Sequence, residues 1–255
     1  MTKQTYGVLI LHGFSASLDC VNGIEPPIQE LGIPTRMPVL RGHNTPSPEA
    51  LVGVKWQDWV ADGEAAYQEL LKEVQRPIVF GHSMGALVAL TLGADHPAEI
   101  DSLILAAPAV ALTNPFAYGS PLHFLSPLAS IFLKQAPMKP AYTDPALAAK
   151  DTNYRWVPTE AASELFEMMK ATRKRLPEIK MPVTILQSHK DGTVPEKAVN
   201  IIYDNISTPP SERKTIWFET SGHEMFRDCE SCEMIQTVVD TVRDRMQLAA
   251  PQPEA

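Results

Sequence analysis

The chain has 255 residues and a formal net charge of −8, and hydrophobic residues make up 44% of it. This length allows one large α/β domain, with or without an insertion, and a core that needs no metal or disulfide to hold it together. The excess of acidic residues argues against nucleic acid and against anionic membrane surfaces as partners.

Cysteine usage and hydropathy indicate the cellular compartment in which the protein is expected. Three cysteines are a low and odd number, which is not typical of a disulfide framework and fits a reducing compartment. Cys229 and Cys232 form a lone C-x-x-C pair outside the context of a redox motif, so no role is assigned to them. No apolar run approaches the ~18 residues of a spanning helix, and residues 1–5 carry no signal-peptide pattern. We therefore expect a cytoplasmic protein without stable membrane insertion.

The first predicted elements lie in the N-terminal third. Residues 7–11 are a continuous apolar run, as in a central parallel strand, and His12, Gly13 and Phe14 follow it. The backbone amide of Phe14 is a candidate oxyanion donor, although a plain strand-to-loop turn is the preferred explanation when this motif is taken alone. Residues 19–31 then predict an interrupted helix, residues 35–39 a short strand and residues 56–74 an amphipathic helix.

The stretch from 77 to 92 organises the rest of the chain. Residues 78–80 indicate a buried strand, Gly-His-Ser-Met-Gly follows at 81–85, and the apolar residues after it predict a buried helix. A serine on a sharp turn exposes its hydroxyl group, and glycines two residues before and after it allow strand and helix to pass closely. This context predicts that Ser83 is a nucleophile. It also makes the amide of Met84, at the helix N-terminus, a second oxyanion donor.

The composition changes over residues 113–180. This segment contains eight prolines and eight of the eighteen aromatic residues but one glycine, and it shows no strand pattern. We predict a small helical lid here, with the alternative of ordinary surface helices and loops. Its last helix has an apolar face that includes Leu165 and Phe166. The core would then consist of residues 1–112 and 181–248, followed by a disordered tail at 249–255.

The strand pattern returns after the predicted lid. Residues 182–187 predict a strand that leads to Asp191, and a helix then extends to about residue 205. Residues 215–218 predict the last strand, and His223 follows it before a final amphipathic helix.

Strands that alternate with helices predict a mostly parallel sheet with helices on both faces. Ligands of such sheets bind beyond the carboxyl ends of the strands. Phe14, Ser83, Asp191 and His223 are all expected at those ends. The chain order Ser, Asp, His is the one expected for this type of nucleophile turn.

With these motifs in place, the sequence resembles the α/β-hydrolase superfamily, and within it the bacterial carboxylesterases and monoacylglycerol lipases. The matching pieces are residues 12–14, 41–43, 81–85, 191–195 and 221–223. Two features depart from other members: His-Gly-Phe replaces the His-Gly-Gly-Gly of the hormone-sensitive-lipase type, and the sheet begins at the strand that others number third. The resemblance implies the α/β-hydrolase fold and a serine esterase mechanism without metal or cofactor.

The chemistry assigns a role to each candidate. A serine hydroxyl is a poor nucleophile until a base accepts its proton, so His223 is the predicted base for Ser83. Asp191 orients the imidazole and stabilises its cation, with Asp228 as the second choice for this role. The amides of Phe14 and Met84 stabilise the oxyanion.

We predict a serine hydrolase for carboxylic esters with an apolar acyl chain, with Phe116, Tyr118, Phe124 and Val194 around the substrate. The same triad could instead cleave thioesters or C–C bonds or carry out perhydrolysis, because the walls of the pocket decide specificity. A non-catalytic binding module on the same fold is the alternative of another class. The expected state in solution is a monomer or weak homodimer.

Overall fold

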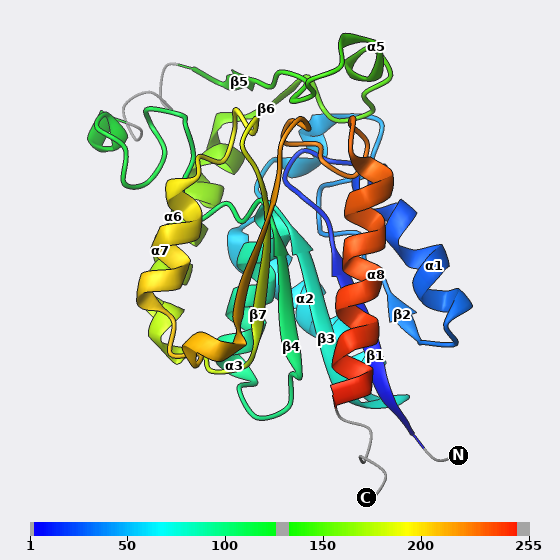
Figure 1. Ribbon diagram of the computed structural model, residues 1–255. Coiled ribbons are helices and arrows are strands. Elements are labelled where there is room, and N and C mark those ends of the chain that lie inside the picture. The colour runs from blue at the N-terminus through cyan, green and yellow to red at the C-terminus, as the bar shows by residue number, and fades with distance from the viewer. Residues whose placement is uncertain (1–2, 126–132, 249–255) are drawn as a thin grey trace, which may run out of the picture.

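The computed structural model describes residues 3–125 and 133–248, and the predicted tail at 249–255 lies outside them. Six strands form one sheet in the order β2-β1-β3-β4-β7-β8, and every neighbouring pair is parallel. Their bounds are β1 Gln4–Leu11, β2 Thr35–Arg36, β3 Val74–His82, β4 Ser102–Ala106, β7 Val183–Ser188 and β8 Arg213–Phe218. This sheet, with helices on both faces, confirms the predicted fold class (Figure 1).

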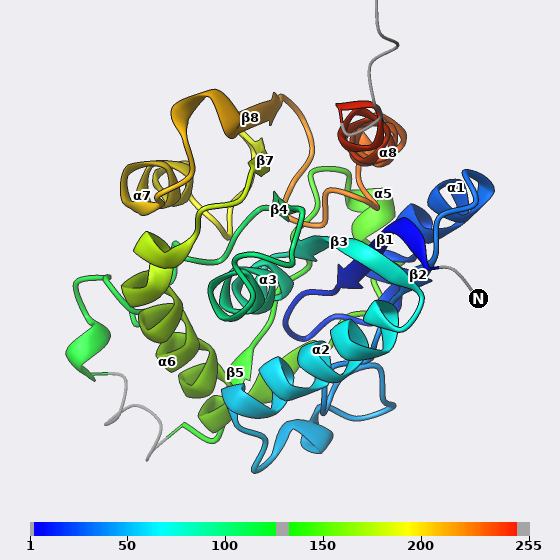
Figure 2. The same cartoon turned by 90° about the horizontal axis from the view of Figure 1, so that it is seen from below.

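Helices cover the two faces of the sheet unequally (Figure 2). Among the described residues, four α-helices pack in the larger hydrophobic cluster, and two pack in the cluster on the opposite face. The larger set is α2 Trp56–Leu71, α3 Met84–Asp95, α6 Thr159–Arg175 and α7 Lys197–Asn205; the smaller is α1 Glu25–Glu30 and α8 Ser231–Leu248. Alternate residues of a strand point to opposite faces, so Leu9 and Leu11 join the larger cluster while Val8 and Ile10 join the smaller one. The central strands are therefore apolar on both sides, which explains their continuous apolar runs.

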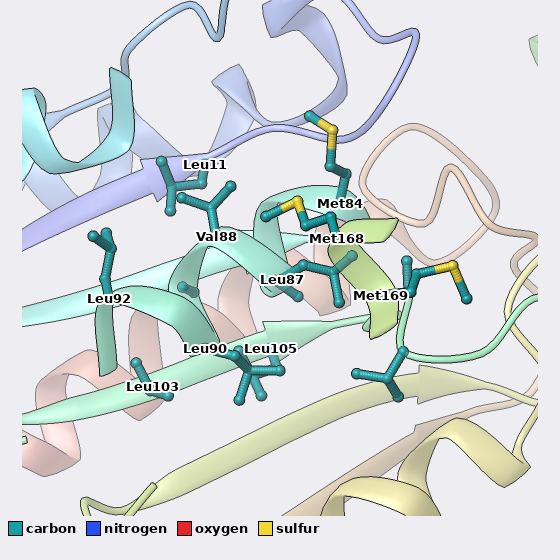
Figure 3. Close-up of a cluster of buried hydrophobic side chains, with 14 of the residues drawn as sticks. Leu11, Met84, Leu87, Val88, Leu90, Leu92, Leu103, Leu105, Met168 and Met169 are labelled. Carbon is teal, nitrogen blue, oxygen red and sulfur yellow. The ribbon is translucent and has the colours of Figure 1, made fainter. Parts of the chain in front are cut away.

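The centre of the larger cluster lies between α3 and α6. Figure 3 shows Leu87 of α3 close to Met168 and Met169 of α6, and all three side chains are fully buried. The helix that follows Ser83 is thus packed between the sheet and a helix of the predicted lid. This packing holds the start of α3, and with it the turn at Ser83, in place.

Several predicted boundaries were wrong for local reasons. The helix expected at 19–31 is two 3₁₀ turns, Leu18–Cys20 and Asn22–Ile24, followed by the short α1, because Pro26 and Pro27 are accepted only in the first turn of a helix. The helix expected at 56–74 ends at Leu71, and Val74 begins β3 instead. The strand expected at 35–39 is β2 alone, since Pro38 has no N–H for the ladder. Further 3₁₀ turns are Pro48–Leu51 and Pro210–Glu212.

The segment 113–180 is less helical than expected. Its described elements are His123–Leu125, β5 Gln135–Pro137, α5 Pro145–Ala148, β6 Trp156–Pro158, α6 and Leu176–Glu178. β5 and β6 pair in antiparallel fashion, so the expectation of no strands was wrong. Each strand has three residues and ends in a proline, which leaves no alternation to detect. The division into a core and a separate lid stays a prediction.

Among the described helices, none combines the length and apolar character that crossing a membrane requires.

Candidate active site

Ser83 occupies the sharp turn between β3 and α3. Its backbone has φ +55° and ψ −112°, a conformation that costs energy for any residue except glycine. A Cβ atom on Gly81 would lie 2.3 Å from the Gly85 carbonyl oxygen, and one on Gly85 would lie 2.3 Å from the Leu11 carbonyl oxygen. The predicted need for glycine at both positions is confirmed, because any side chain there would force strand and helix apart.

Ser83, His223 and Asp191 form one hydrogen-bonded chain. Ser83 Oγ lies 2.9 Å from His223 Nε2, and His223 Nδ1 lies 2.8 Å from Asp191 Oδ2. The other carboxylate oxygen, Asp191 Oδ1, accepts the backbone N–H groups of Thr193 and Val194 at 2.8 and 2.9 Å. The carboxylate is thereby held so that it faces Nδ1, and Nε2 is left to accept the serine proton. The structure thus brings together the three residues predicted as a triad.

The electrostatics of the pair suit proton transfer. Burial lowers the pKa of His223, but the Asp191 carboxylate beside it outweighs that effect, so the pKa lies above its ordinary 6.5. Burial raises the pKa of Asp191, but the His223 ring and the two backbone N–H groups bring it below its ordinary value. Asp191 therefore stays ionised and stabilises the imidazolium that forms when Ser83 loses its proton.

The backbone amides of Phe14 and Met84 were predicted as oxyanion donors. Met84 is the first residue of α3, so its N–H has no acceptor within the helix. A Cβ on Gly13 would lie 3.4 Å from Ser83 Cβ, which shows that the loop carrying Phe14 passes beside the nucleophile. Within the described part of the chain, neither amide has a hydrogen-bond acceptor. Their use as oxyanion donors stays a prediction.

Other histidines near Ser83 have structural roles. His82 Nε2 lies 3.0 Å from the His223 carbonyl oxygen, and burial lowers the pKa of His82 to about 3. The neutral ring therefore donates Nε2–H and holds the His223 backbone. His12 Nε2 accepts the N–H of Leu40 at 3.0 Å, and burial lowers the pKa of His12 to about 4.

Two carboxylates that the sequence did not single out as loop anchors hold the loop that carries His223. Glu230 accepts the backbone N–H groups of residues 219–221 at 2.8–3.0 Å. Asp228, the second choice for the triad acid, accepts the N–H groups of Gly222 and Thr143, both at 2.6 Å. It makes no bond to the His223 ring. Its role is to tie the His223 loop to the segment above the sheet.

A cavity of about 190 Å³ opens at Ser83 and His223, and it adjoins a larger one of about 630 Å³. Apolar and polar side chains both line the cavity at Ser83, and the apolar residues that the two cavities share include Met138 and Phe166. The apolar residues that line the smaller cavity are Phe14, Leu112, Ala136, Pro137, Met138, Ala141, Ala162, Leu165 and Phe166. Such walls suit an acyl chain.

The structure separates the four residues that were predicted to lie around the substrate. Phe116 lines only the larger cavity, and the other three line neither. Val194 is fully buried, Tyr118 packs beneath the Arg173 guanidinium at 5.2 Å, and Phe124 is 74% exposed.

The residues that line the cavity include several that the sequence did not indicate as substrate contacts, chiefly Leu112, Met138, Tyr154 and Glu224. Leu165 and Phe166 were recognised as an apolar helix face but not as pocket walls. No local pattern marks such positions, because each contributes one side chain from a different loop or helix. Among the described residues, no cluster of three or more His, Cys, Asp or Glu side chains is arranged to hold a metal ion.

Sequence comparisons with known proteins identify a family and relatives of this chain. Residues 3–230 match the family model described as serine aminopeptidase, S33. A thermostable monoacylglycerol lipase of Bacillus sp. (strain H-257) is 27% identical over 234 residues, which are 90% of this chain and 87% of the relative. A carboxylesterase of Bacillus subtilis (strain 168) is 26% identical over 225 residues, which are 88% of this chain and 86% of the relative.

Solved structures share the fold. A structure described with the metagenome-derived lipolytic enzymes LipS and LipT has a TM-score of 0.83 at 22% identity and covers 95% of both chains. A monoglyceride lipase of Saccharomyces cerevisiae, solved as a soluble variant with a substrate analogue, has a TM-score of 0.77 at 15% identity. It covers 96% of this chain and 88% of its own.

Proposed function

Because the chain belongs to the serine aminopeptidase S33 family of α/β-hydrolases, we propose that it is a serine hydrolase that cleaves carboxylic esters with an apolar acyl chain. The observation that carries the proposal is the Ser83–His223–Asp191 chain at a cavity whose wall includes apolar side chains such as Leu112, Met138 and Phe166. The relatives named monoacylglycerol lipase and carboxylesterase support an ester as the substrate.

Acylation uses each member of the triad in turn. His223 Nε2 takes the proton of Ser83 while Oγ bonds to the ester carbonyl carbon, and the oxyanion that forms is stabilised by the amides of Phe14 and Met84. His223 then gives the proton to the leaving alcohol as the C–O bond breaks. The acyl group remains on Ser83.

Deacylation repeats the same proton transfers, with water as the attacking group. His223 takes a proton from water, the hydroxide bonds to the acyl carbon, and the Ser83 ester bond breaks as Oγ regains a proton. Asp191 stays ionised throughout, and its carboxylate stabilises the His223 ring most strongly while the ring is positively charged. The acyl-enzyme splits one difficult step into two easier ones.

A substrate panel with one acyl group tests the reaction class. Octanoate presented as an ester, a thioester and an anilide keeps the acyl pocket constant while the scissile bond changes. We expect the highest kcat/KM for the ester, and labelling of Ser83 but not of a Ser83→Ala variant by a fluorophosphonate. Amide cleavage as fast as ester cleavage would instead favour the peptidase activity that the family name describes.

We further propose that the protein acts in the cytoplasm as a monomer or weak homodimer. The low cysteine count supports a reducing compartment. Light scattering across a hundredfold range of concentration gives the oligomeric state, and a stable tetramer at all concentrations would contradict this.

A further inference from the structure

His12 is fully buried directly before the peptide unit that joins Gly13 to Phe14, and the proposed mechanism assigns it no role. Its Nδ1 lies 2.9 Å from the carbonyl oxygen of Gly13, and its Nε2 lies 3.0 Å from the backbone nitrogen of Leu40. A backbone N–H can only donate, so Nε2 is the acceptor for Leu40 and carries no proton. Burial lowers the pKa of His12 to about 4, which keeps the ring neutral. The one ring proton is therefore on Nδ1, which donates it to Gly13.

The Gly13 carbonyl and the Phe14 N–H belong to one peptide unit. This unit is planar and trans, so the carbonyl and the N–H point in opposite directions. A hydrogen bond that fixes the direction of the carbonyl therefore also fixes the direction of the N–H. Among the residues that the structure describes, His12 is the one donor to the Gly13 carbonyl oxygen.

Gly13 itself restricts this peptide unit only weakly, because a residue without a Cβ atom allows its backbone more rotation than any other. A side chain has little room here: its Cβ would lie 3.3 Å from His82 Nδ1 and 3.4 Å from Ser83 Cβ. The turn at Ser83 thus disfavours the side chain that could restrict the unit. A hydrogen bond from outside the unit has to supply the restriction.

The loop at residues 40–43, which contains the Arg-Gly-His motif, holds the His12 ring in place. The rings of His12 and His43 pack edge to face with 5.1 Å between their centroids, and both side chains are buried. Trp59 of α2 donates its Nε1–H to the Arg41 carbonyl oxygen at 3.0 Å. A continuous set of contacts therefore leads from α2 through this loop and His12 to the peptide unit.

We infer that His12 is a positioning residue for the reaction: its Nδ1–H holds the Gly13 carbonyl and thereby aims the Phe14 N–H at the oxyanion. The inference rests on the proposed ester hydrolysis and deepens it. A carbonyl that accepts a hydrogen bond also polarises its peptide unit, which makes the N–H of that unit a stronger donor. His12 lines neither cavity, so it acts through the Phe14 amide and not on the substrate.

Two substitutions separate the two hydrogen bonds of His12. His12→Asn places a nitrogen where Nδ1 was, so it keeps a donor for Gly13 and loses the acceptor for Leu40. His12→Gln places an oxygen where Nε2 was, so it keeps the acceptor for Leu40 and loses the donor for Gly13. Removal of one oxyanion donor costs about 100- to 1000-fold in kcat, and a misdirected donor should cost less.

Ethyl octanoate serves as the substrate for these variants. We expect kcat/KM to fall by about 10- to 100-fold in His12→Gln and by less than about fivefold in His12→Asn. His96 lies at the far end of α3 and bonds to Glu64. His96→Asn is therefore the matched control and should leave kcat/KM unchanged.

Two ketones of the same chain length distinguish positioning from a merely structural role. Octyl trifluoromethyl ketone bonds to Ser83 Oγ, the proton passes to His223, and the ketone carbonyl becomes an oxyanion. Octyl methyl ketone remains a ketone and reports only how well the chain binds. In His12→Gln, the Ki of the trifluoromethyl ketone should rise by the factor by which kcat/KM falls, whereas the Ki of the methyl ketone should change by less than about twofold.

A measurement on the wild-type protein needs no variant to fold. Nitrogen NMR of protein labelled at histidine should show His12 as the neutral Nδ1–H tautomer at neutral pH. The amide resonances of Phe14 and Met84 should both shift when the trifluoromethyl ketone binds. An Nε2–H tautomer, or a Phe14 amide that does not respond while Met84 does, would overturn the inference.

Each contrary outcome with the variants also has a definite meaning. An equal rise of Ki for both ketones in His12→Gln assigns a structural role to His12 and overturns the inference. A larger loss of kcat/KM in His12→Asn than in His12→Gln overturns it too, as do unchanged rates in both variants. A wild type that cleaves no ester and does not bind the trifluoromethyl ketone would overturn the proposed function itself, so the two failures are distinguishable.

Discussion

Two regions meet at the cavity, and different interactions hold them. The strand-end loops, which carry Ser83, Asp191 and His223, follow β3, β7 and β8 and rest on regular backbone hydrogen bonds. The cover segment, residues 113–125 and 133–158, contains only short elements, and its part with β5, α5 and β6 lies across the ends of the strands (Figure 1).

Backbone and side-chain hydrogen bonds attach the cover segment to the rest of the molecule. Tyr154 Oη donates to the Gly42 carbonyl oxygen and accepts the N–H of Thr45, both at 3.1 Å, and Asp228 accepts the N–H of Thr143. The strand-end loops are thus continuous with the sheet, whereas the cover segment is attached by scattered hydrogen bonds and by a few buried side chains such as Ala117 and Val157. The comparison indicates that the reaction type is built into the sheet and that substrate choice is built into the cover segment and α6.

The largest expected effect comes from removing the catalytic side chains of the strand-end loops. Ser83→Ala and His223→Ala should each lower kcat by about 10⁶-fold, and the double variant should be no slower, because the two groups act as a unit. Steady-state kinetics and thermal unfolding of the three variants check this, with Tm expected to change little. Losses that multiply in the double variant would show that the two side chains act independently.

Asp191→Asn should be the next largest effect. The geometry stays, but the amide cannot stabilise the imidazolium, and kcat should fall by about 10⁴-fold. Because the Asp191 carboxylate raises the pKa of His223, its removal should lower that pKa. The acid limb of kcat/KM should then move to lower pH than in the wild type. A limb that stays in place would point to another acid.

Substitution of two phenylalanines tests which of them contributes to the acyl wall. Phe166 lines both cavities, whereas Phe124 is 74% exposed. Phe166→Ala should shift the preferred acyl length toward longer chains. The discrimination between acyl chains that differ by one methylene group should change by about 10- to 200-fold. Phe124→Ala should keep the wild-type profile across p-nitrophenyl esters of increasing length. A shift caused by Phe124→Ala alone would reverse the assignment of the acyl wall.

The smallest effect concerns the anchor of the His223 loop. Glu230→Gln loses charged hydrogen bonds to residues 219–221 and should lower the free energy of unfolding by about 1–3 kcal/mol at pH 7. Burial opposes ionisation of Glu230, but these N–H groups lower its pKa from 4.5 to about 2. The contribution is therefore full above pH 4.5 and is lost as the pH falls through 2. Urea unfolding at pH 7 and pH 3 measures it, and an equal difference at both would contradict this origin.

The sequence by itself determined the fold class and the positions that meet at Ser83. Buried parallel strands leave long apolar runs, and the turn at Ser83 requires glycine at 81 and 85, so both features are written in short stretches of sequence. Asp191 and His223 follow strands, and the carboxyl ends of parallel strands share one edge. Local patterns and a topological rule were sufficient for these residues.

Only the tertiary structure decided which side chains form the walls of the cavity. Phe124, expected at the site, is exposed, while Met138 and Glu224 come from separate loops and line it. Contacts of this kind join residues far apart in the chain and leave no periodic pattern. The three-residue strands β5 and β6 escaped prediction because pairing with each other, rather than sequence preference, makes them strands.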